Sequence, residues 1–205
     1  MAWREEVART KRAAFEGEEY WGKPVPGFGD PMARIVVIGL APAAHGANRT
    51  GRMFTGDRSG DWLFRALHTA GLASQPHSVS TTDGLTLSDV WITAPVRCAP
   101  PQNKPTPAER DACSSWFDAE LGMLANARVF VALGQYGYHA LWAHLARAGQ
   151  PLPVPRPKFA HGLETAIGPL TILTSFHVSQ QNTFTGRLTV EMLDAVFLRA
   201  VRLVS

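Results

Sequence analysis

Short hydrophobic runs alternate along the chain with longer segments in which hydrophobic residues recur every three or four positions. Compact runs rich in β-branched residues predict buried strands at residues 34–38, 87–93, 128–134 and 170–175. Helical spacing predicts amphipathic helices at residues 1–12, 59–71, 106–124 and 136–147, and a last helix whose hydrophobic face runs from Leu188 to Val201. A strand followed by a helix, four times over, predicts one α/β domain over residues 1–205, with a four-stranded, mostly parallel sheet flanked by helices.

Two of the predicted helices have well-marked ends. Thr106 is followed by a proline and then by Glu109, which is the spacing of a capping box with proline at the first helical position. Ser59 is a suitable N-cap for the helix that ends at Gly71. The proline-rich residues 151–157 are expected to form an extended surface connection.

The longest predicted loop, residues 39–57, follows the first strand directly. It is polar and contains four glycines, unlike a packed helix or strand. Ligands of open α/β sheets bind at the carboxyl ends of the strands, and a loop of this length in a compact domain is usually functional or disordered. The sequence therefore favours a binding loop here, with an ordinary solvated connection as the alternative.

Polar residues follow each predicted strand, and parallel strands bring their carboxyl ends to one edge of the sheet. We therefore expect one cleft to collect Asn48, Arg49, Asp57, Arg97, Asn103, Gln135, Tyr136, His177, Gln180, Gln181 and Asn182. A carboxylate, an amide and an imidazole beside the ring of Phe54 would hydrogen-bond and sandwich a planar heterocycle. Taken singly, each residue also has a structural explanation. Asp57 suits a cap, Asn103 a turn and Phe54 the core, while His177 suits a hydrogen-bonded strand end.

Composition and charge narrow the class of protein only modestly. The 205 residues are 45% hydrophobic and 18% charged, an ordinary composition for a globular domain. The net charge of +3 permits a polyanionic partner without requiring one. The sequence shows neither a hydrophobic stretch long enough for a membrane span nor a signal-peptide pattern, so we expect a cytoplasmic protein with no membrane partner. A disulfide between the two cysteines is not expected in that compartment.

Several common catalytic patterns are missing from the sequence. Gly46 and Gly51 have the spacing of a phosphate-binding loop, but the lysine and the serine or threonine that would hold phosphate and Mg²⁺ are absent. The dinucleotide-binding G-x-G-x-x-G, the nucleophile elbow G-x-S-x-G and the zinc motif H-E-x-x-H are absent as well. His139 and His144 are five residues apart, so they do not share a helix face as a pair of zinc ligands would.

Three long segments together resemble the family 5, or type b, uracil-DNA glycosylases, which carry an iron–sulfur cluster. The first segment runs from Gly39-Leu-Ala-Pro-Ala to Phe54-Thr-Gly-Asp57, the second is Arg97-Cys-Ala-Pro-Pro-Gln-Asn-Lys-Pro-Thr-Pro107, and the third is Ser175-Phe-His-Val-Ser-Gln-Gln-Asn-Thr-Phe-Thr-Gly-Arg187. The resemblance extends from about Trp3 to the end of the chain. It implies a monofunctional enzyme of base excision repair that removes uracil, and also deaminated purines such as hypoxanthine and xanthine, from DNA.

The resemblance also assigns roles to individual residues. Asp57 would position or activate water, Asn103 would hold the base or sugar, and His177 would hydrogen-bond the departing base. Phe54 would stack on a base swung out of the helix, with Gly39, Leu40 and Ala41 completing the substrate site. Asp61 is the alternative carboxylate. Asp57 is preferred because it matches the family motif, whereas Asp61 falls in the first turn of a helix, where it suits the dipole.

Contacts with DNA are expected from two further groups of residues. In the resemblance, the segment after His177 enters the DNA, and its contact residues would be Gln180, Gln181, Asn182 and Arg187. Arg49, Arg52 and Lys104 would add phosphate contacts that weaken as salt is raised. Helix capping and surface hydrogen bonding are the structural alternatives for these side chains. The expected partner is uracil-containing DNA, single- or double-stranded, bound by a monomer.

The cysteines depart from the family pattern. The family holds a [4Fe–4S] cluster with four cysteine thiolates, two in an N-terminal C-x-x-C and two at the positions of Cys98 and Cys113. Only this second pair is present, and two thiolates do not complete a four-cysteine site. We expect either that the native product is longer at its N-terminus or that the chain lacks the cluster, with Cys98 and Cys113 as free thiols. In the second case a non-catalytic nucleic-acid or nucleotide binder on the same fold is the alternative function.

Overall fold

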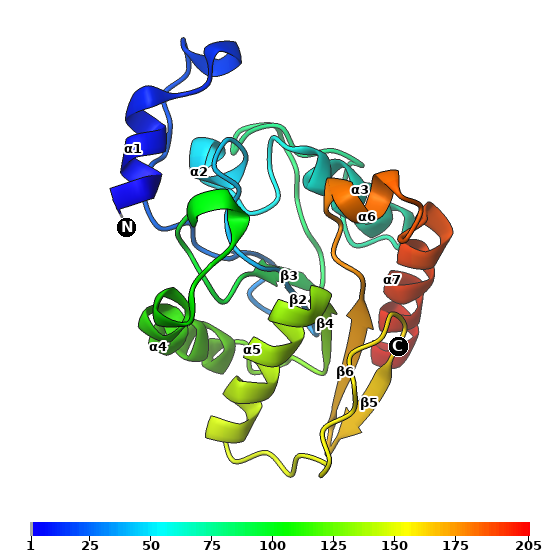
Figure 1. The fold of residues 1–205 in the computed structure, drawn as a ribbon. Helices are drawn as coiled ribbons and strands as arrows, with labels where there is room; N and C mark the ends of the chain where they lie inside the picture. Colours follow the sequence, from blue (N-terminus) through cyan, green and yellow to red (C-terminus); the bar gives the residue numbers. More distant parts are fainter. Residues whose placement is uncertain (1) are drawn as a thin grey trace.

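The computed structural model describes residues 2–205, which form a six-stranded sheet with helices on both faces (Figure 1). The strand order is β1-β3-β2-β4-β6-β5. The central strands β3, β2, β4 and β6 are parallel, and the edge strands β1 and β5 are antiparallel to their neighbours. The bounds are β1 Phe28–Gly29, β2 Ile35–Ile38, β3 Val90–Thr93, β4 Val129–Leu133, β5 Glu164–Ile167 and β6 Leu170–Ser175.

The predicted α/β class and the four predicted strands are confirmed, but the predicted number of strands was too low. The missed strand β1 has only two residues and lies in a segment rich in proline and glycine. The missed strand β5 pairs with β6 across a tight turn, and its side chains alternate between exposed and buried, as expected for an edge strand. Both additions lie at the edges, so the four central strands still set the position of the loops.

The long predicted helices are present with shifts of a few residues at their ends. They are α1 Ala2–Thr10, α3 Arg58–Thr69, α4 Pro107–Met123, α5 Gly134–Arg147 and α7 Val190–Val204. Thr106 caps α4 in a complete capping box with Glu109, as the sequence predicted. Four short helices were not predicted, namely α2 Ala47–Thr50, α6 Gln180–Phe184, η1 Ala13–Phe15 and η2 Pro101–Asn103. Met1, the start of the predicted first helix, lies outside the described residues.

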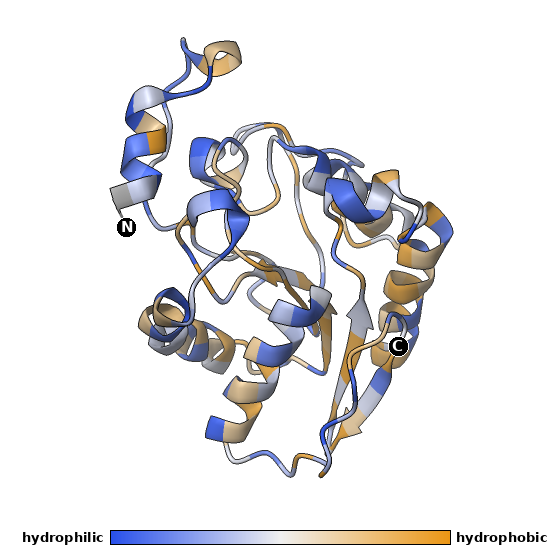
Figure 2. Cartoon of the chain, in the orientation of Figure 1, coloured by the Kyte–Doolittle hydropathy of each residue, from blue (hydrophilic) through white to orange (hydrophobic). Residues whose placement is uncertain are grey.

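The sheet is buried on both faces, and its side chains alternate between two hydrophobic cores. Ile35 and Val37 of β2 face α3 and α7, whereas Val36 and Ile38 face α4 and α5. Figure 2 shows hydrophobic residues concentrated in the central strands. This double burial explains why β2 reads as an unbroken hydrophobic run rather than an alternating one. None of the helices between residues 2 and 205 combines the length and the hydrophobicity that a bilayer span requires.

The carboxyl ends of the central strands share one edge of the sheet. The loops there contain α2 and η2, the start of α3, and α6, which Figure 1 shows beyond the tip of β6. The loops that carry the candidate site residues are therefore brought together by strand direction alone.

Helix α7 provides a test of the core on the α3 side of the sheet. Phe197 of α7 is fully buried, whereas its neighbour Leu198 is 42% exposed. We expect Phe197→Ala to lower the free energy of unfolding by about 3–5 kcal/mol, because it removes a ring and leaves a cavity. Leu198→Ala is the matched control and should cost less than about 1 kcal/mol. Urea unfolding followed by circular dichroism measures both, and similar losses for the two variants would contradict this description of the core.

Candidate active site

A cavity of about 460 Å³ lies at the carboxyl edge of the sheet. Its lining includes the three residues predicted to converge, Asp57, Asn103 and His177, and the ring of Phe54 beside them. Leu40 and Ala41 add an apolar wall, while Lys104, Gln180 and Gln181 also line it. The expected convergence of the three strand-end loops on one cleft is therefore present in the structure.

Asp57 has both a structural and a cavity-facing role. It is the N-cap of α3, and its Oδ1 atom accepts hydrogen bonds from the backbone N–H groups of Ser59 at 2.9 Å and Gly60 at 3.1 Å. A Cβ atom added at Gly46 would lie 2.1 Å from Oδ2, so the loop backbone approaches this second oxygen closely. Burial raises the pKa of the Asp57 carboxyl, against the opposing effect of the two N–H donors. The carboxylate is thus held rigidly in a poorly solvated place.

Asp61 does not line this cavity. It is exposed in the first turn of α3, where a carboxylate complements the helix dipole. The structure therefore supports the preference for Asp57 as the carboxylate of the site.

Phe54 adopts an unusual backbone conformation to reach the cavity. Its φ of 55° lies in the left-handed region, which costs a non-glycine residue about 1–3 kcal/mol. A Cβ atom at Gly39 would lie 2.7 Å from the tip of the Phe54 ring, and one at Gly60 would lie 1.8 Å from its carbonyl oxygen. The backbone of Gly39 therefore packs against the tip of the Phe54 ring, and Gly39 itself does not line the cavity. The surrounding residues must hold Phe54 firmly for this conformation to persist.

His177 follows β6 directly and shares the cavity with Phe54. The two ring centroids are 6.3 Å apart and the ring planes differ by 33°. Burial lowers the pKa of His177 to about 4, so the imidazole is neutral at pH 7. A neutral imidazole has one N–H donor and one acceptor, which suits it to hydrogen-bond a heterocycle without carrying charge.

Asn103 reaches the cavity from the loop after β3. Gln102 and Asn103 both have a φ of 55°, at the end of the short helix η2. Asparagine tolerates the left-handed conformation better than most residues. Asn103 and Lys104 are both exposed, so this side of the cavity is open to solvent.

Two predicted phosphate contacts are contradicted by the structure. The side chain of Arg52 is only 8% exposed and forms an ion pair with Asp83 at 2.6 Å. The side chain of Arg49 is 10% exposed, pairs with Glu18, and donates hydrogen bonds to the carbonyl oxygens of His45 and Gly56. Both guanidinium groups are committed to the protein interior, so they are not available to DNA.

Other polar residues expected at the cleft lie elsewhere. Asn48 is fully buried and donates to the carbonyl oxygen of Arg4, and Arg97 forms an ion pair with the buried Glu120 at 2.6 Å. Asn182 donates to the carbonyl oxygen of His177 at 2.8 Å, which makes it a support of the loop rather than an obvious contact residue. Gln135 and Tyr136 lie in the first turn of α5 and do not line the cavity.

Four polar residues that line the cavity, Arg58, Ser59, Gln102 and Ser179, were not predicted as site residues. Arg58, the first residue of α3, is exposed there and its guanidinium lies 4.9 Å from the ring centroid of Phe184 on α6. Ser179 caps α6 and also lines the cavity. Both residues stand next to predicted site residues along the chain, so their position was a usable signal. Arg187, a predicted contact, is exposed with its guanidinium 4.5 Å from the ring centroid of Phe176.

The two cysteines do not form a four-thiolate site. Cys98 is half-buried and accepts a hydrogen bond from Arg4 Nη1 at 2.8 Å, and Cys113 is buried. Within residues 2–205, no group of three or more histidine, cysteine or acidic side chains is arranged to hold a metal ion. With two cysteines in the whole sequence, the residues present do not fit a [4Fe–4S] cluster.

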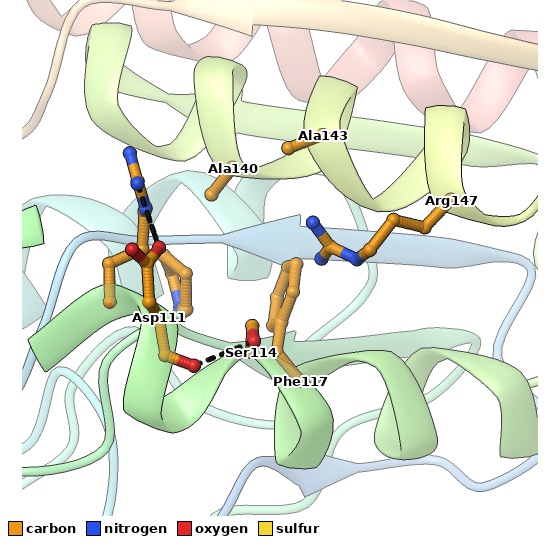
Figure 3. A pocket seen from close by; sticks show the side chains of 8 residues that line it. Asp111, Ser114, Phe117, Ala140, Ala143 and Arg147 are labelled. Atoms are coloured by element: carbon orange, nitrogen blue, oxygen red, sulfur yellow. Dashed lines mark hydrogen bonds and ion pairs between the residues drawn. The ribbon is translucent and has the colours of Figure 1, made fainter. Parts of the chain in front are cut away.

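A second, smaller cavity lies between α4 and α5 (Figure 3). Its volume of about 110 Å³ has room for only a few water molecules. Its charged side chains are already paired, Arg110 with Asp111 and Arg147 with Asp118. The larger cavity at the sheet edge is therefore the better candidate for a substrate site.

Comparison with known proteins points to one family. The model of the uracil DNA glycosylase superfamily matches residues 26–200. A type-5 uracil-DNA glycosylase of Thermus thermophilus is 54% identical over 204 residues, which cover 99% of this chain and 90% of that protein. Another of Mycobacterium tuberculosis is 53% identical over 205 residues, 99% of this chain and 75% of that protein. A type-4 uracil-DNA glycosylase of Pyrobaculum aerophilum is 30% identical over 135 residues, 65% of this chain and 61% of that protein.

The raised pKa of Asp57 leads to a stability prediction. Asparagine caps helices as well as aspartate does, so Asp57→Asn keeps the cap and removes a buried charge. We expect its thermal midpoint at pH 7.5 to equal or exceed that of the unmodified chain. Because the folded-state pKa is raised, the wild-type carboxyl takes up a proton as the pH falls, and the difference should shrink toward pH 4. Calorimetry measures this, with the exposed Asp61→Asn as the control, and a clearly lower midpoint for Asp57→Asn at pH 7.5 would contradict it.

Proposed function

The chain belongs to the uracil-DNA glycosylase superfamily, and on this basis we propose that it excises uracil from DNA by hydrolysing the N-glycosidic bond, the first step of base excision repair. The observation that carries the proposal is the shared cavity of Asp57, Asn103, His177 and Phe54. A carboxylate, an amide, an imidazole and an aromatic face are what a flipped base and its sugar require.

Binding begins with removal of the base from the DNA stack. A base inside a duplex cannot reach a cavity in a protein, so the nucleotide must swing out of the helix. The ring of Phe54 would stack on the extruded base and recover part of the lost stacking energy, roughly 1–3 kcal/mol for a base on an aromatic side chain. Asn103 would hydrogen-bond the base or sugar from the open side of the cavity.

Bond cleavage separates charge, and two groups are placed to stabilise it. Negative charge develops on the departing uracil, and a neutral His177 would donate a hydrogen bond to it. Positive charge develops on the sugar, and the Asp57 carboxylate would stabilise it and orient the attacking water. Because Oδ1 of Asp57 is already bonded to α3, Oδ2 would perform this role. The water adds to the sugar carbon as the bond to the base breaks, and its proton passes through solvent to the uracil anion, leaving an abasic site and free uracil.

The rim of the cavity supplies the groups for DNA contact. Lys104, Arg58 and Arg187 are exposed cations that would bind phosphates. Gln180 and Gln181 line the cavity from α6 and would contact the strand around the flipped nucleotide.

We propose that a monomer suffices, because the cavity is lined from one chain. The size of the cavity also supports the proposal that hypoxanthine and xanthine are accepted as bases.

The cluster implied by the resemblance takes no part in this mechanism. Cys98 and Cys113 alone do not fit it, and the groups proposed to act on substrate are all side chains of the cavity.

The proposed activity is tested on an oligonucleotide with one uracil, by alkaline cleavage of the abasic product. We expect excision by the unmodified chain, and single-turnover rates at least about 100-fold lower for Asp57→Asn and His177→Ala, because each removes a group that stabilises transition-state charge. Asp61→Asn should retain nearly full activity. Parallel substrates with hypoxanthine and xanthine measure base preference. A salt-sensitive gel shift without any abasic product would instead identify a non-catalytic binder.

The pH dependence of the rate distinguishes the roles of the two titratable groups. Asp57 must be ionised, and its pKa is raised, so the rate should fall on acidification with a midpoint above 3.8, the usual value for aspartate. His177 stays neutral down to about pH 4, so it should add no limb near pH 6.5. His177→Asn should keep the acid limb at a lower overall rate. A limb near pH 6.5 that disappears in His177→Asn would show that the imidazole titrates there, and would contradict its staying neutral down to about pH 4.

A further inference from the structure

Arg52 is buried beneath the segment that carries Phe54 and Asp57. Its Nη2 atom donates to Asp83 Oδ2 and to Ser78 Oγ, both at 2.6 Å, and its Nε donates to Thr55 Oγ1 at 3.0 Å. The guanidinium also lies 5.5 Å from the ring centroid of Phe28. Arg52 therefore joins the site loop to a segment about thirty residues further along the chain.

That second segment, residues 74–86, is a loop closed on itself. Ser74 and Thr86 are joined by a backbone hydrogen bond, and the side chain of Asp83 accepts from the N–H groups of Val79 at 2.7 Å and Leu85 at 3.1 Å. Arg52 and these N–H groups hold the pKa of Asp83 well below its ordinary value, so the carboxylate is charged at all working pH values. The loop thus presents a fixed anion to Arg52.

Two more bonds join the segments on the other side of Phe54. Ser78 accepts a hydrogen bond from the Gly56 N–H through its carbonyl oxygen at 3.1 Å, and its hydroxyl lies 2.6 Å from Thr55 Oγ1. Residues 52, 55 and 56 are therefore all tied to the 74–86 loop. Phe54 stands between these ties, in its left-handed conformation, and Asp57 follows directly.

We propose that the Arg52–Asp83 ion pair positions Phe54 and Asp57 for reaction, an inference that rests on the proposed uracil excision. Both side chains are less than a tenth exposed. A buried ion pair contributes little net stability compared with apolar residues of similar size, because desolvation offsets the attraction. Its directional bonds instead fix one arrangement of the loop. Arg52 does not touch substrate in this scheme and acts through its neighbours.

Replacing both charges with apolar residues separates positioning from stability. We expect Arg52→Met/Asp83→Leu to fold, with a thermal midpoint within about 4 °C of the unmodified chain, because apolar replacement of a buried pair is often neutral. Its single-turnover rate at saturating enzyme should fall at least about tenfold, since small displacements of reacting groups are costly. The enzyme concentration that gives half the maximal rate should change much less, because the exposed DNA contacts remain. The matched control is Arg65→Met/Asp194→Leu, which removes a pair between α3 and α7 and should keep the normal rate.

The outcomes distinguish the two proposals. If the unmodified chain excises no uracil, the proposed function fails. If it is active and the double variant is folded with an unchanged rate, the positioning role is wrong. Should the double variant not fold, Asp83→Asn keeps the shape of the side chain, and a circular dichroism melt identifies a temperature at which it is folded. A tenfold lower rate at that temperature supports positioning, and an unchanged rate overturns it.

Discussion

The hydrogen bonds from the backbone of α3 to Asp57 are the interaction on which the site depends. One carboxylate oxygen accepts both hydrogen bonds at the start of α3 and the other takes part in neither, so the same residue caps the helix and lines the cavity. Burial makes the charge unfavourable, and the two N–H donors keep it in place. Helix capping and the catalytic role proposed for Asp57 are therefore compatible, because they use different oxygens of one carboxylate.

The positions of the central strands and of their loops along the chain could be predicted from local sequence, but side-chain partners could not. The hydrophobic runs and glycine stops located the four central strands and their loops, and parallel pairing then brought Asp57, Asn103 and His177 together. Arg49 and Arg52 were misassigned because their partners Glu18 and Asp83 lie about thirty residues away, and nothing in the local pattern reveals such a pair. The edge strand β5 was missed because four residues carry little periodicity.

The loop between β2 and α3 combines several unfavourable features in a few residues. Phe54 has positive φ, Asp57 is a poorly solvated carboxylate, and Arg52 is a buried cation. Each carries a cost that the two hydrophobic cores offset. Such concentrated strain is typical of functional sites, because the conformation suited to bind a substrate is rarely the one of lowest free energy for the empty protein.

Three glycines outside the cavity lining pack closely against the two residues Phe54 and Asp57. No side chain fits at Gly39, Gly46 or Gly60, because the nearest atoms of Phe54 or Asp57 lie within 3 Å of where a Cβ atom would be. The side chains that line the cavity itself include those of Ala41 and Ala43, which are half-buried. A redesign of the cavity would therefore begin at these two alanines rather than at the three glycines.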